Sequence, residues 1–311
     1  MPLAGNAENQ TKSRELAEEA ALSVEVESIQ KMVYKKLDCI RDVPTLPAIA
    51  LRAVEISNDD DSSARELADF IGKDQALTSK LLSLVNAAAY GVAGKVATVG
   101  RAVVIMGFAR VRTVILSSAM GNIFSGNSEC LDRNRLWLHS VGTATAARLI
   151  AKGEIGIDAE AAYIAGLLHE VGIVILDRYF HDALKAAVQV AYAKQSTIDS
   201  ALRELIGIDQ FRVGAYLANR WQLPSALTSA IGLHNTPPAS DANASIIAAV
   251  HVASMIADAC KMNYEPYAAR KPISANAINL LNITPQKIKH AADELNKQRP
   301  NIEEFADMCS K

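Results

Sequence analysis

The stretch Ala165–Gly172, which reads AGLLHEVG, decides how the rest of the chain is interpreted. It is apolar except for the adjacent residues His169 and Glu170, and neighbouring polar side chains are expensive to bury unless polar partners face them. His139 lies 30 positions upstream in another apolar segment, Leu136–Ser140. That separation is short enough for two antiparallel helices to bring His139 beside His169. We therefore expect a buried polar group where two helices meet.

Helical spacing of apolar residues continues on both sides of this stretch. The 311 residues are 50% hydrophobic and include only 16 glycines and 10 prolines, so few residues interrupt the apolar segments. No period-two pattern and no strand-helix alternation competes with it, so we predict an all-α fold. The expected helices are Asn9–Val43, Ala48–Ser57, Ser63–Ile71, Gln75–Ala89, Thr98–Gly107, Ala109–Phe124, Arg135–Lys152, Ala159–Asp177, His181–Ala193, Ser200–Leu205, Gln210–Trp221, Ile246–Met262 and one that begins at Thr284-Pro285.

The clearest change of composition in the middle of the chain is Ser125–Ser128, which reads SGNS. We place a boundary there, between two packed helical subdomains. The predicted organisation is a charged helical or flexible extension over residues 1–25, an N-terminal subdomain over 26–125, a second over 126–275 and a C-terminal helical segment over 276–311. The amphipathic helix that precedes Pro44 is expected to pack on the body of the protein.

Composition also excludes several classes of protein. The 32 basic and 34 acidic residues give a net charge of −2, and aromatic residues make up 5%, which argues against nucleic acid as a partner. The start of the chain, Met1–Glu19, lacks the apolar run of a signal peptide, and no uncharged apolar run reaches the length that a bilayer requires. The four cysteines show no Cys-x-x-Cys spacing. We expect a cytoplasmic protein with free thiols and no membrane span.

Local motifs for common chemistries are missing. The pair at 169 and 170 is not part of a zincin motif, because position 173 is isoleucine, and no nucleophile elbow or phosphate-cradling P-loop occurs. Arg101, Arg110 and Arg112 could bind an anion such as a nucleotide phosphate. A solvated helix face is the preferred interpretation of these three arginines.

The chain resembles the HDOD family, the HD-related output domain of bacterial signalling proteins, from Val43 to Tyr267. The order and spacing of several short phrases carry the resemblance. These phrases are Leu46-Pro47, Asp74–Leu82 with Asn86 and Tyr90-Gly91, Ala102–Gly107, Leu136–Ser140, Gly166–Gly172, Glu204, Val213–Ala215, Trp221–Pro224 and Ala230–His234. The resemblance implies that the second subdomain is an HD-type helical bundle.

The resemblance also implies where a metal site would lie. The related HD phosphohydrolases hold a divalent metal with a histidine, a His-Asp pair and a later aspartate, and the ion activates a water. The matching positions are His139, the pair His169-Glu170, and Ser254 in place of the last aspartate. A hydroxyl at 254 leaves two histidines and one carboxylate, too few charges to hold Mg or Mn firmly.

Two residues are possible substitutes for the missing aspartate. Asp258 lies one turn beyond Ser254, and His251 lies three residues before it. Gln210 and Asn235 also stand where HD-type sequences can have histidine. We therefore expect a vestigial site, in which the two histidines and the glutamate form a hydrogen-bonded group that fixes helix register.

These features predict a non-catalytic signal-transduction or regulatory module without a cofactor. It would bind a signalling protein or a second copy of itself, or a small nucleotide in the old catalytic pocket. The alternative is an HD-type phosphohydrolase that acts on a phosphoester or nucleotide with Mn, Mg, Fe or Zn. In that case Asp258 or His251 would complete the metal shell of His139, His169 and Glu170.

Overall fold

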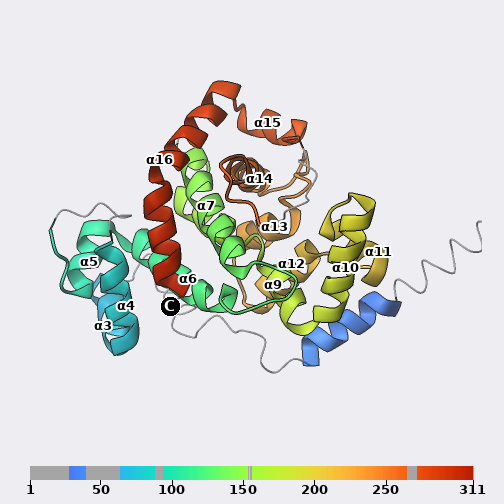
Figure 1. The fold of residues 1–311 in the computed structure, drawn as a ribbon. Coiled ribbons are helices and arrows are strands. Elements are labelled where there is room, and N and C mark those ends of the chain that lie inside the picture. The colour runs from blue at the N-terminus through green and yellow to red at the C-terminus, as the bar shows by residue number, and fades with distance from the viewer. Residues whose placement is uncertain are drawn as a thin grey trace, which may run out of the picture.

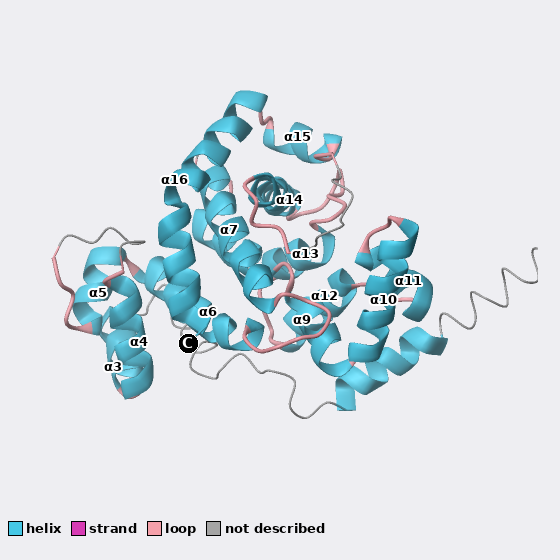
Figure 2. Ribbon diagram, viewed as in Figure 1, coloured by secondary structure: helices cyan, strands magenta, loops and turns pink. Residues whose placement is uncertain are grey.

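Helices form every regular element in the part of the chain that the computed structural model describes, in agreement with the predicted all-α fold (Figure 2). The described residues are 28–39, 64–87, 94–152, 154, 156–264 and 272–310. The predicted helix Ala48–Ser57 and both ends of the predicted helix Asn9–Val43 lie outside the described residues.

The first described helix covers residues 28–39. The helices that follow it are α3 (Ala64–Gly72), α4 (Gln75–Val85), α5 (Val99–Met106), α6 (Phe108–Phe124), α7 (Arg133–Ala151), α8 (Ala159–Leu168), α9 (Val171–Tyr179), α10 (His181–Lys194), α11 (Ile198–Ile206), α12 (Gln210–Arg220), α13 (Ser225–Leu233), α14 (Ala244–Ala259), α15 (Ala275–Leu281) and α16 (Pro285–Ser310). Three caps that the sequence indicates are present. Asp74, Thr98 and Thr284 accept hydrogen bonds from backbone N–H groups three residues later, at 2.9, 3.2 and 3.3 Å.

The core is built around α7 and α14, which pack on each other and on α8 (Figure 1). The small group α3–α5 lies on one side of this core, and α10 and α11 lie on the other (Figure 1). The helix over residues 28–39 packs on the body beside α12, as expected. The rings of Tyr34 and Tyr216 are 5.4 Å apart, and Arg220 donates a 2.8 Å hydrogen bond to the backbone carbonyl of Leu37.

The predicted single helix Ala159–Asp177 is wrong, because the chain turns between α8 and α9 at His169 and Glu170. His169 Nδ1 lies 2.6 Å from the carbonyl oxygen of Gly166, which in a continuous helix would accept from the backbone N–H of residue 170. The segment is buried on all sides, so its apolar pattern contained no sign of the break.

Apolar segments in this fold are core helices. The run Ala159–Tyr179 is long and apolar enough to cross a membrane by composition, but 83% of its apolar window is buried inside the protein. Taken together, α5 and α6 pass the same test, yet they meet at a bend of 119°. The bend lies at Gly107, whose φ of 79° is a backbone conformation that favours glycine.

Gly166 sets how closely α8 approaches α7. A methyl group at this position would lie 2.8 Å from the Cα atom and 2.9 Å from the nitrogen of Ala144 on α7. Both neighbours are backbone atoms, which cannot move aside as a flexible side chain can. The missing side chain at Gly166 therefore allows the contact that brings α8, and the residues after it, against α7.

We expect Gly166→Ala to lower the free energy of unfolding by about 1–3 kcal/mol, because the added methyl group forces the two helices apart. Urea unfolding followed by circular dichroism measures this change. Gly100→Ala, in α5, is the matched control, since nothing lies within 4 Å of the added methyl group. The control should be neutral or stabilising by up to about 1 kcal/mol, as for glycine in a helix. Equal stability of both variants would contradict the role assigned to Gly166.

Candidate functional site

His139 lies on the face of α7 that α8 and α14 cover, and its side chain is 2% exposed. Its Nε2 atom is 3.2 Å from Nε2 of His169. The hydroxyl groups of Thr143 and Ser254 lie 3.5 and 3.4 Å from the same nitrogen. The structure thus brings together the two histidines that the sequence analysis paired, with Ser254 beside them.

His169 and Glu170 occupy the turn between α8 and α9. His169 is fully buried, and its Nε2 atom lies 3.5 Å from Oε1 of Glu170. The other carboxylate oxygen of Glu170 accepts a 3.0 Å hydrogen bond from the Tyr264 hydroxyl. One ligand atom from each of His139, His169 and Glu170 therefore lies within 4.8 Å of the others, which is a spacing that could hold a metal ion.

Hydrogen bonding fixes which ring nitrogen of His169 carries the proton. Its Nδ1 atom faces the Gly166 carbonyl, which can only accept, so the proton is on Nδ1 and the lone pair is on Nε2. His139 can then donate from Nε2 to this lone pair. On the opposite side of the His139 ring, Asp258 Oδ1 lies 3.3 Å from Nδ1. Asp258 therefore faces the outer nitrogen of His139 and lies apart from the group of three ligand atoms.

His251 is directed toward other partners. Its Nδ1 atom lies 2.8 Å from the backbone carbonyl of His234, and its Nε2 atom accepts a 3.0 Å hydrogen bond from the backbone N–H of Ser274. Both ring nitrogens are thus engaged away from His139 and His169. His251 links the end of α13 to the start of α15.

Two further residues belong to the site that the sequence analysis did not assign to it. The ring of His234 packs edge-on against His169 at a centroid distance of 4.9 Å. Tyr264 packs edge-on against His139 at 5.5 Å and also donates to Glu170. His234 stood in the family resemblance without a role, whereas Tyr264 lies in a loop where no periodicity points to the core.

Gln210 stands where related sequences can have histidine, and it is buried at the start of α12. Neither polar atom of its side-chain amide has a hydrogen-bond partner among the described residues. A buried amide without partners is unusual in a protein core. No described residue uses the donor or the acceptor of this amide.

Burial keeps both histidines of the site neutral. It lowers the pKa of His139 to about 3, with a smaller contribution from the nearby His234. It also lowers the pKa of His169 well below its ordinary value, and His234 and His139 add to that shift. Neutral imidazoles can hydrogen-bond to each other and can also serve as metal ligands.

The chemistry of the donors can be tested against the hard cations of HD phosphohydrolases. Mg²⁺ and Mn²⁺ prefer oxygen ligands, and this group offers two imidazoles and the single carboxylate of Glu170. The hydroxyl of Ser254 adds no negative charge, and Asp258 faces the other side of His139. The residues therefore fit such a centre poorly. Nitrogen-preferring ions such as Zn²⁺ suit this donor set better.

A second group of possible metal ligands lies at Cys130, Asp177 and His181. Asp177 is already paired there with the buried guanidinium of Arg133 at 3.1 Å and accepts a 2.7 Å hydrogen bond from Ser128. Burial raises the pKa of the Cys130 thiol, which makes the thiolate form less accessible. These contacts indicate a structural link between α7, α9 and α10. His181 is the first residue of α10, and its Nδ1 atom lies 3.2 Å from Oδ1 of Asp177.

Residues 43–237 match the model of the HDOD domain family. An uncharacterised protein of Treponema pallidum (strain Nichols) is 26% identical over 231 residues, which cover 72% of this chain and 44% of that relative. The chain thus spans less than half the length of this relative.

Solved structures with the same fold carry three different descriptions. An HDOD domain protein of unknown function from Geobacter sulfurreducens is 26% identical, with a TM-score of 0.75 over 91% of this chain and 98% of that one. A candidate signal transduction protein from Marinobacter aquaeolei VT8 is 20% identical, with a TM-score of 0.74 over 92% and 66%. A candidate phosphohydrolase from Shewanella amazonensis SB2B is 23% identical, with a TM-score of 0.70 over 88% and 97%. The last two likenesses show the fold alone.

The lowered pKa values predict that stability falls in mild acid. The unfolded chain binds protons on these histidines near pH 6.5 while the folded chain does not. Their contribution to the free energy of unfolding is therefore fully present above this pH and is lost progressively toward pH 3. Between pH 7.5 and 5.5, each buried histidine should account for a loss of about 1 kcal/mol. Urea unfolding at the two pH values measures it.

His139→Gln should reduce that loss by about 1 kcal/mol, because one of the two titrating groups is gone. His290→Gln is the control, since His290 is an exposed residue of α16. An unchanged pH dependence in His139→Gln would contradict the neutral, buried state of His139.

Proposed function

Since the chain belongs to the HDOD family, we propose that it is a non-catalytic signal-transduction or regulatory module whose HD-type pocket has become a structural element. The observation that carries the proposal is the donor set of the pocket. Two neutral histidines contact each other there beside one carboxylate, and a hydroxyl stands in place of the fourth ligand of HD enzymes. Such a set provides little negative charge for a hard cation.

The proposed resting arrangement is a hydrogen bond from His139 Nε2 to His169 Nε2. It satisfies both buried rings on the side where they meet, because His169 donates from its other nitrogen to the Gly166 carbonyl. In this tautomer the outer nitrogen of His139 carries a lone pair that faces the Asp258 carboxylate at 3.3 Å. Two acceptors repel each other at that distance, and hydration of Asp258, whose side chain is 36% exposed, must reduce the repulsion. The pocket then holds α7, α8 and α14 in register without an ion.

Regulation would proceed by contact with another signalling protein, or with a second copy of this chain, in the cytoplasm. Two exposed apolar side chains on α5 support this mode. Val104 and Ile105 are 79% and 44% exposed. Neighbouring large apolar side chains exposed in this way are typical of a surface that contacts another protein. A small nucleotide is the other class of partner that the family resemblance suggested. We propose neither nucleic acid nor membrane as a partner.

A metal-dependent phosphohydrolase is the second candidate function. It is favoured by the 4.8 Å grouping of His139, His169 and Glu170 and by the neutral state of both rings, which metal ligation requires. Binding of an ion would need the other tautomer of His139, with its proton on Nδ1 toward Asp258. The two candidate functions therefore require different protonation of the His139 ring. The hydrolase also requires that one carboxylate, Glu170, be enough to hold the ion.

Metal titration separates these functions. We expect calorimetry to find no saturable Mn²⁺ binding by the wild-type chain, because the pocket holds one carboxylate. Ser254→Asp should raise the Mn²⁺ affinity at least tenfold, since it adds a carboxylate next to His139. Ser254→Asn is the control of the same size without charge and should bind like the wild type.

A screen with generic phosphomonoesters and phosphodiesters in the presence of Mn²⁺ or Zn²⁺ completes the test. The proposal expects no turnover above that of His169→Ala, with the fold of each variant checked by circular dichroism. Tight, stoichiometric metal in the purified wild type, or turnover that His169→Ala abolishes, would overturn the non-catalytic assignment in favour of the hydrolase.

The tautomers provide a separate prediction. Long-range ¹⁵N–¹H spectra of the histidine rings at pH 7 should show His169 protonated on Nδ1 and His139 protonated on Nε2, both neutral. The spectrum of His139→Gln assigns the signals. If both rings carry the proton on Nδ1, their Nε2 lone pairs face each other at 3.2 Å, and the proposed hydrogen bond between them does not exist.

A further inference from the structure

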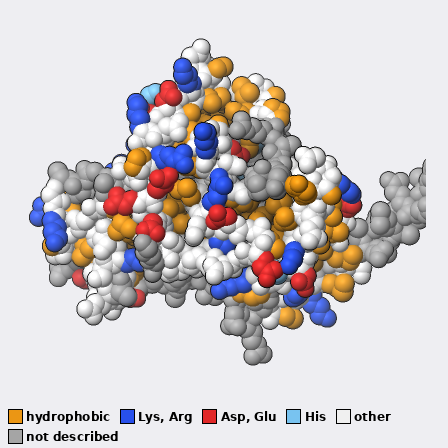
Figure 3. Space-filling model, viewed as in Figure 1, with side chains coloured by type: hydrophobic (Ala, Val, Ile, Leu, Met, Phe, Trp, Pro, Cys, Tyr) orange, Lys and Arg blue, Asp and Glu red, His pale blue; other side chains and the backbone are white. Residues whose placement is uncertain are grey.

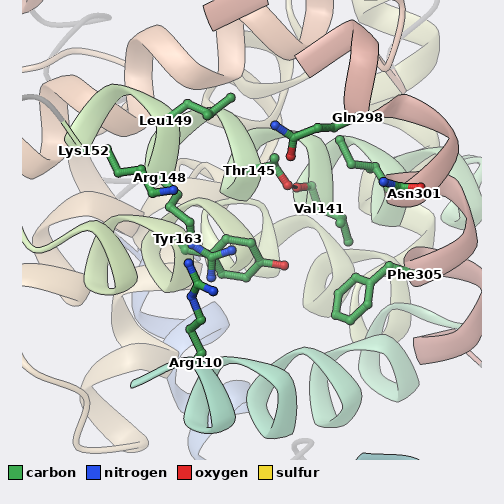
Figure 4. A pocket seen from close by; sticks show the side chains of 11 residues that line it. Arg110, Val141, Thr145, Arg148, Leu149, Lys152, Tyr163, Gln298, Asn301 and Phe305 are labelled. Atoms are coloured by element: carbon green, nitrogen blue, oxygen red, sulfur yellow. Dashed lines mark hydrogen bonds between the residues drawn. The ribbon is translucent and has the colours of Figure 1, made fainter. Parts of the chain in front are cut away.

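A cavity of about 210 Å³ lies on the other side of α7, between α6, α8 and α16 (Figure 4). Its walls differ in character. Arg110, Arg148 and Lys152 stand at one end, while Gln298 and Asn301 from α16 stand across from them (Figure 4). None of these residues belongs to the HD-type pocket.

Arg148 is held in place before any ligand arrives. Its guanidinium stacks on the ring of Tyr163 at 3.8 Å from the centroid, and one of its terminal nitrogens donates to Glu160 at 2.7 Å. Its Nε–H is buried and has no hydrogen-bond partner among the described residues. A guanidinium fixed by stacking loses little entropy when it binds an anion.

Positive charge exceeds negative charge at this end of the cavity. Figure 4 shows the side chains of Arg110 and Arg148 reaching the same place beside Tyr163. Glu160 is the carboxylate that pairs with Arg148, and it also accepts from Thr113 at 2.8 Å. Arg110 has no ion pair among the described residues. Of these two guanidinium groups, Arg148 pairs with a carboxylate and Arg110 pairs with none among the described residues, which leaves room for a second anion.

Arg112 adds one positive charge to this group, and Asp158 adds one negative charge. Arg112 is buried on α6, and the carboxylates of Asp158 and Glu160 interact with its charge. The negative charge of Glu160 is therefore divided between Arg112 and Arg148. Of the three arginines that the sequence analysis assigned to a solvated face, Arg112 is buried and Arg110 lines a cavity. Arg101 is exposed on α5 and fits that assignment.

The opposite wall offers neutral hydrogen-bonding groups. The side-chain amides of Gln298 and Asn301 have no hydrogen-bond partner among the described residues, although they line the cavity. They flank Pro300, which lies inside α16 and removes one backbone hydrogen bond of that helix. Free amides can recognise hydroxyl groups or a nucleobase edge. The charged end and the amide wall together match a ligand with an anionic head and a polar body.

We propose that this cavity binds a small organic phosphate, with the phosphate between Arg110 and Arg148 and the polar remainder against Gln298 and Asn301. Lys152 ends α7, where a cation also stabilises the helix terminus, so its presence is explained without a ligand and the proposal does not depend on it. The inference goes beyond the function proposed above and holds whether or not the HD-type pocket binds metal.

Calorimetry on the full chain at constant ionic strength tests the proposal. The probes are inorganic phosphate, AMP and glucose 6-phosphate, with adenosine and glucose as controls that lack phosphate and citrate as an anion without phosphorus. We expect inorganic phosphate and at least one organic phosphate to bind, the organic one more tightly. Adenosine, glucose and citrate should bind at least tenfold more weakly than that organic phosphate. If AMP binds more tightly than glucose 6-phosphate, the ligand class is nucleotides; the reverse order indicates sugar phosphates.

Arg110→Gln should weaken binding of every phosphate at least tenfold. Arg110 is exposed, so the variant should fold like the wild type, which circular dichroism checks. Arg101→Gln changes the net charge equally outside the cavity and should leave binding unchanged. Gln298→Ala should weaken the organic phosphate more than inorganic phosphate, because it removes a contact to the polar remainder.

Three results would overturn the assignment. They are the absence of saturable binding by any phosphate at millimolar concentration, equal binding by Arg110→Gln and the wild type, and citrate affinity that matches the organic phosphates. Each of these leaves the metal titration of the HD-type pocket unaffected, so the two proposals fail separately.

Discussion

The close approach of α8 to α7 at Gly166 is the contact on which the rest of the site depends. The absence of a side chain lets two backbones meet at Ala144, and the Gly166 carbonyl then accepts from the ring of His169. That hydrogen bond ends α8, turns the chain at Glu170 and aims the other nitrogen of His169 at His139. One glycine therefore sets the packing distance, the helix break and the tautomer together. A larger residue would disturb all three, because each depends on the same backbone position.

Desolvation explains how this polar group is accommodated in the core. Taking two imidazoles out of water favours their neutral forms, and neutral rings avoid the large penalty of buried charge. Once neutral, each ring still needs partners, and the geometry supplies them from His139, His169 and the Gly166 carbonyl. A pocket of this kind specifies helix register through hydrogen bonds that apolar side chains could not replace. Under the proposed function, this group remains in place with Glu170 as the carboxylate beside the two rings.

Features carried by local chemistry could be predicted from the sequence. Capping side chains such as Asp74 and Thr98, the helical spacing and the pairing of His139 with His169 rest on short-range rules or on matched phrases. The break at Glu170 could not, because a helix buried on all sides has no polar face to mark its end. Tyr264 and the cavity beside Arg148 were also invisible. Both join segments that are distant in the sequence. Only the tertiary packing brings Tyr264 from its loop to Glu170 and places α16 across the cavity from Arg148.

The two candidate sites share α7 as a wall. His139 and Arg148 are nine residues apart, and at 100° per residue their side chains leave the helix on opposite faces. α16 closes the face that carries Arg148, and the Ala306 carbonyl on α16 accepts a 3.0 Å hydrogen bond from Trp137 on α7. The last turn of α16 also accepts from Lys80 on α4, at the carbonyl of Cys309. A ligand held between α7 and α16 would stabilise the helix that links the HD-type core to the group α3–α5. Contacts therefore run from the cavity along α16 to α4 without passing through the histidine pocket.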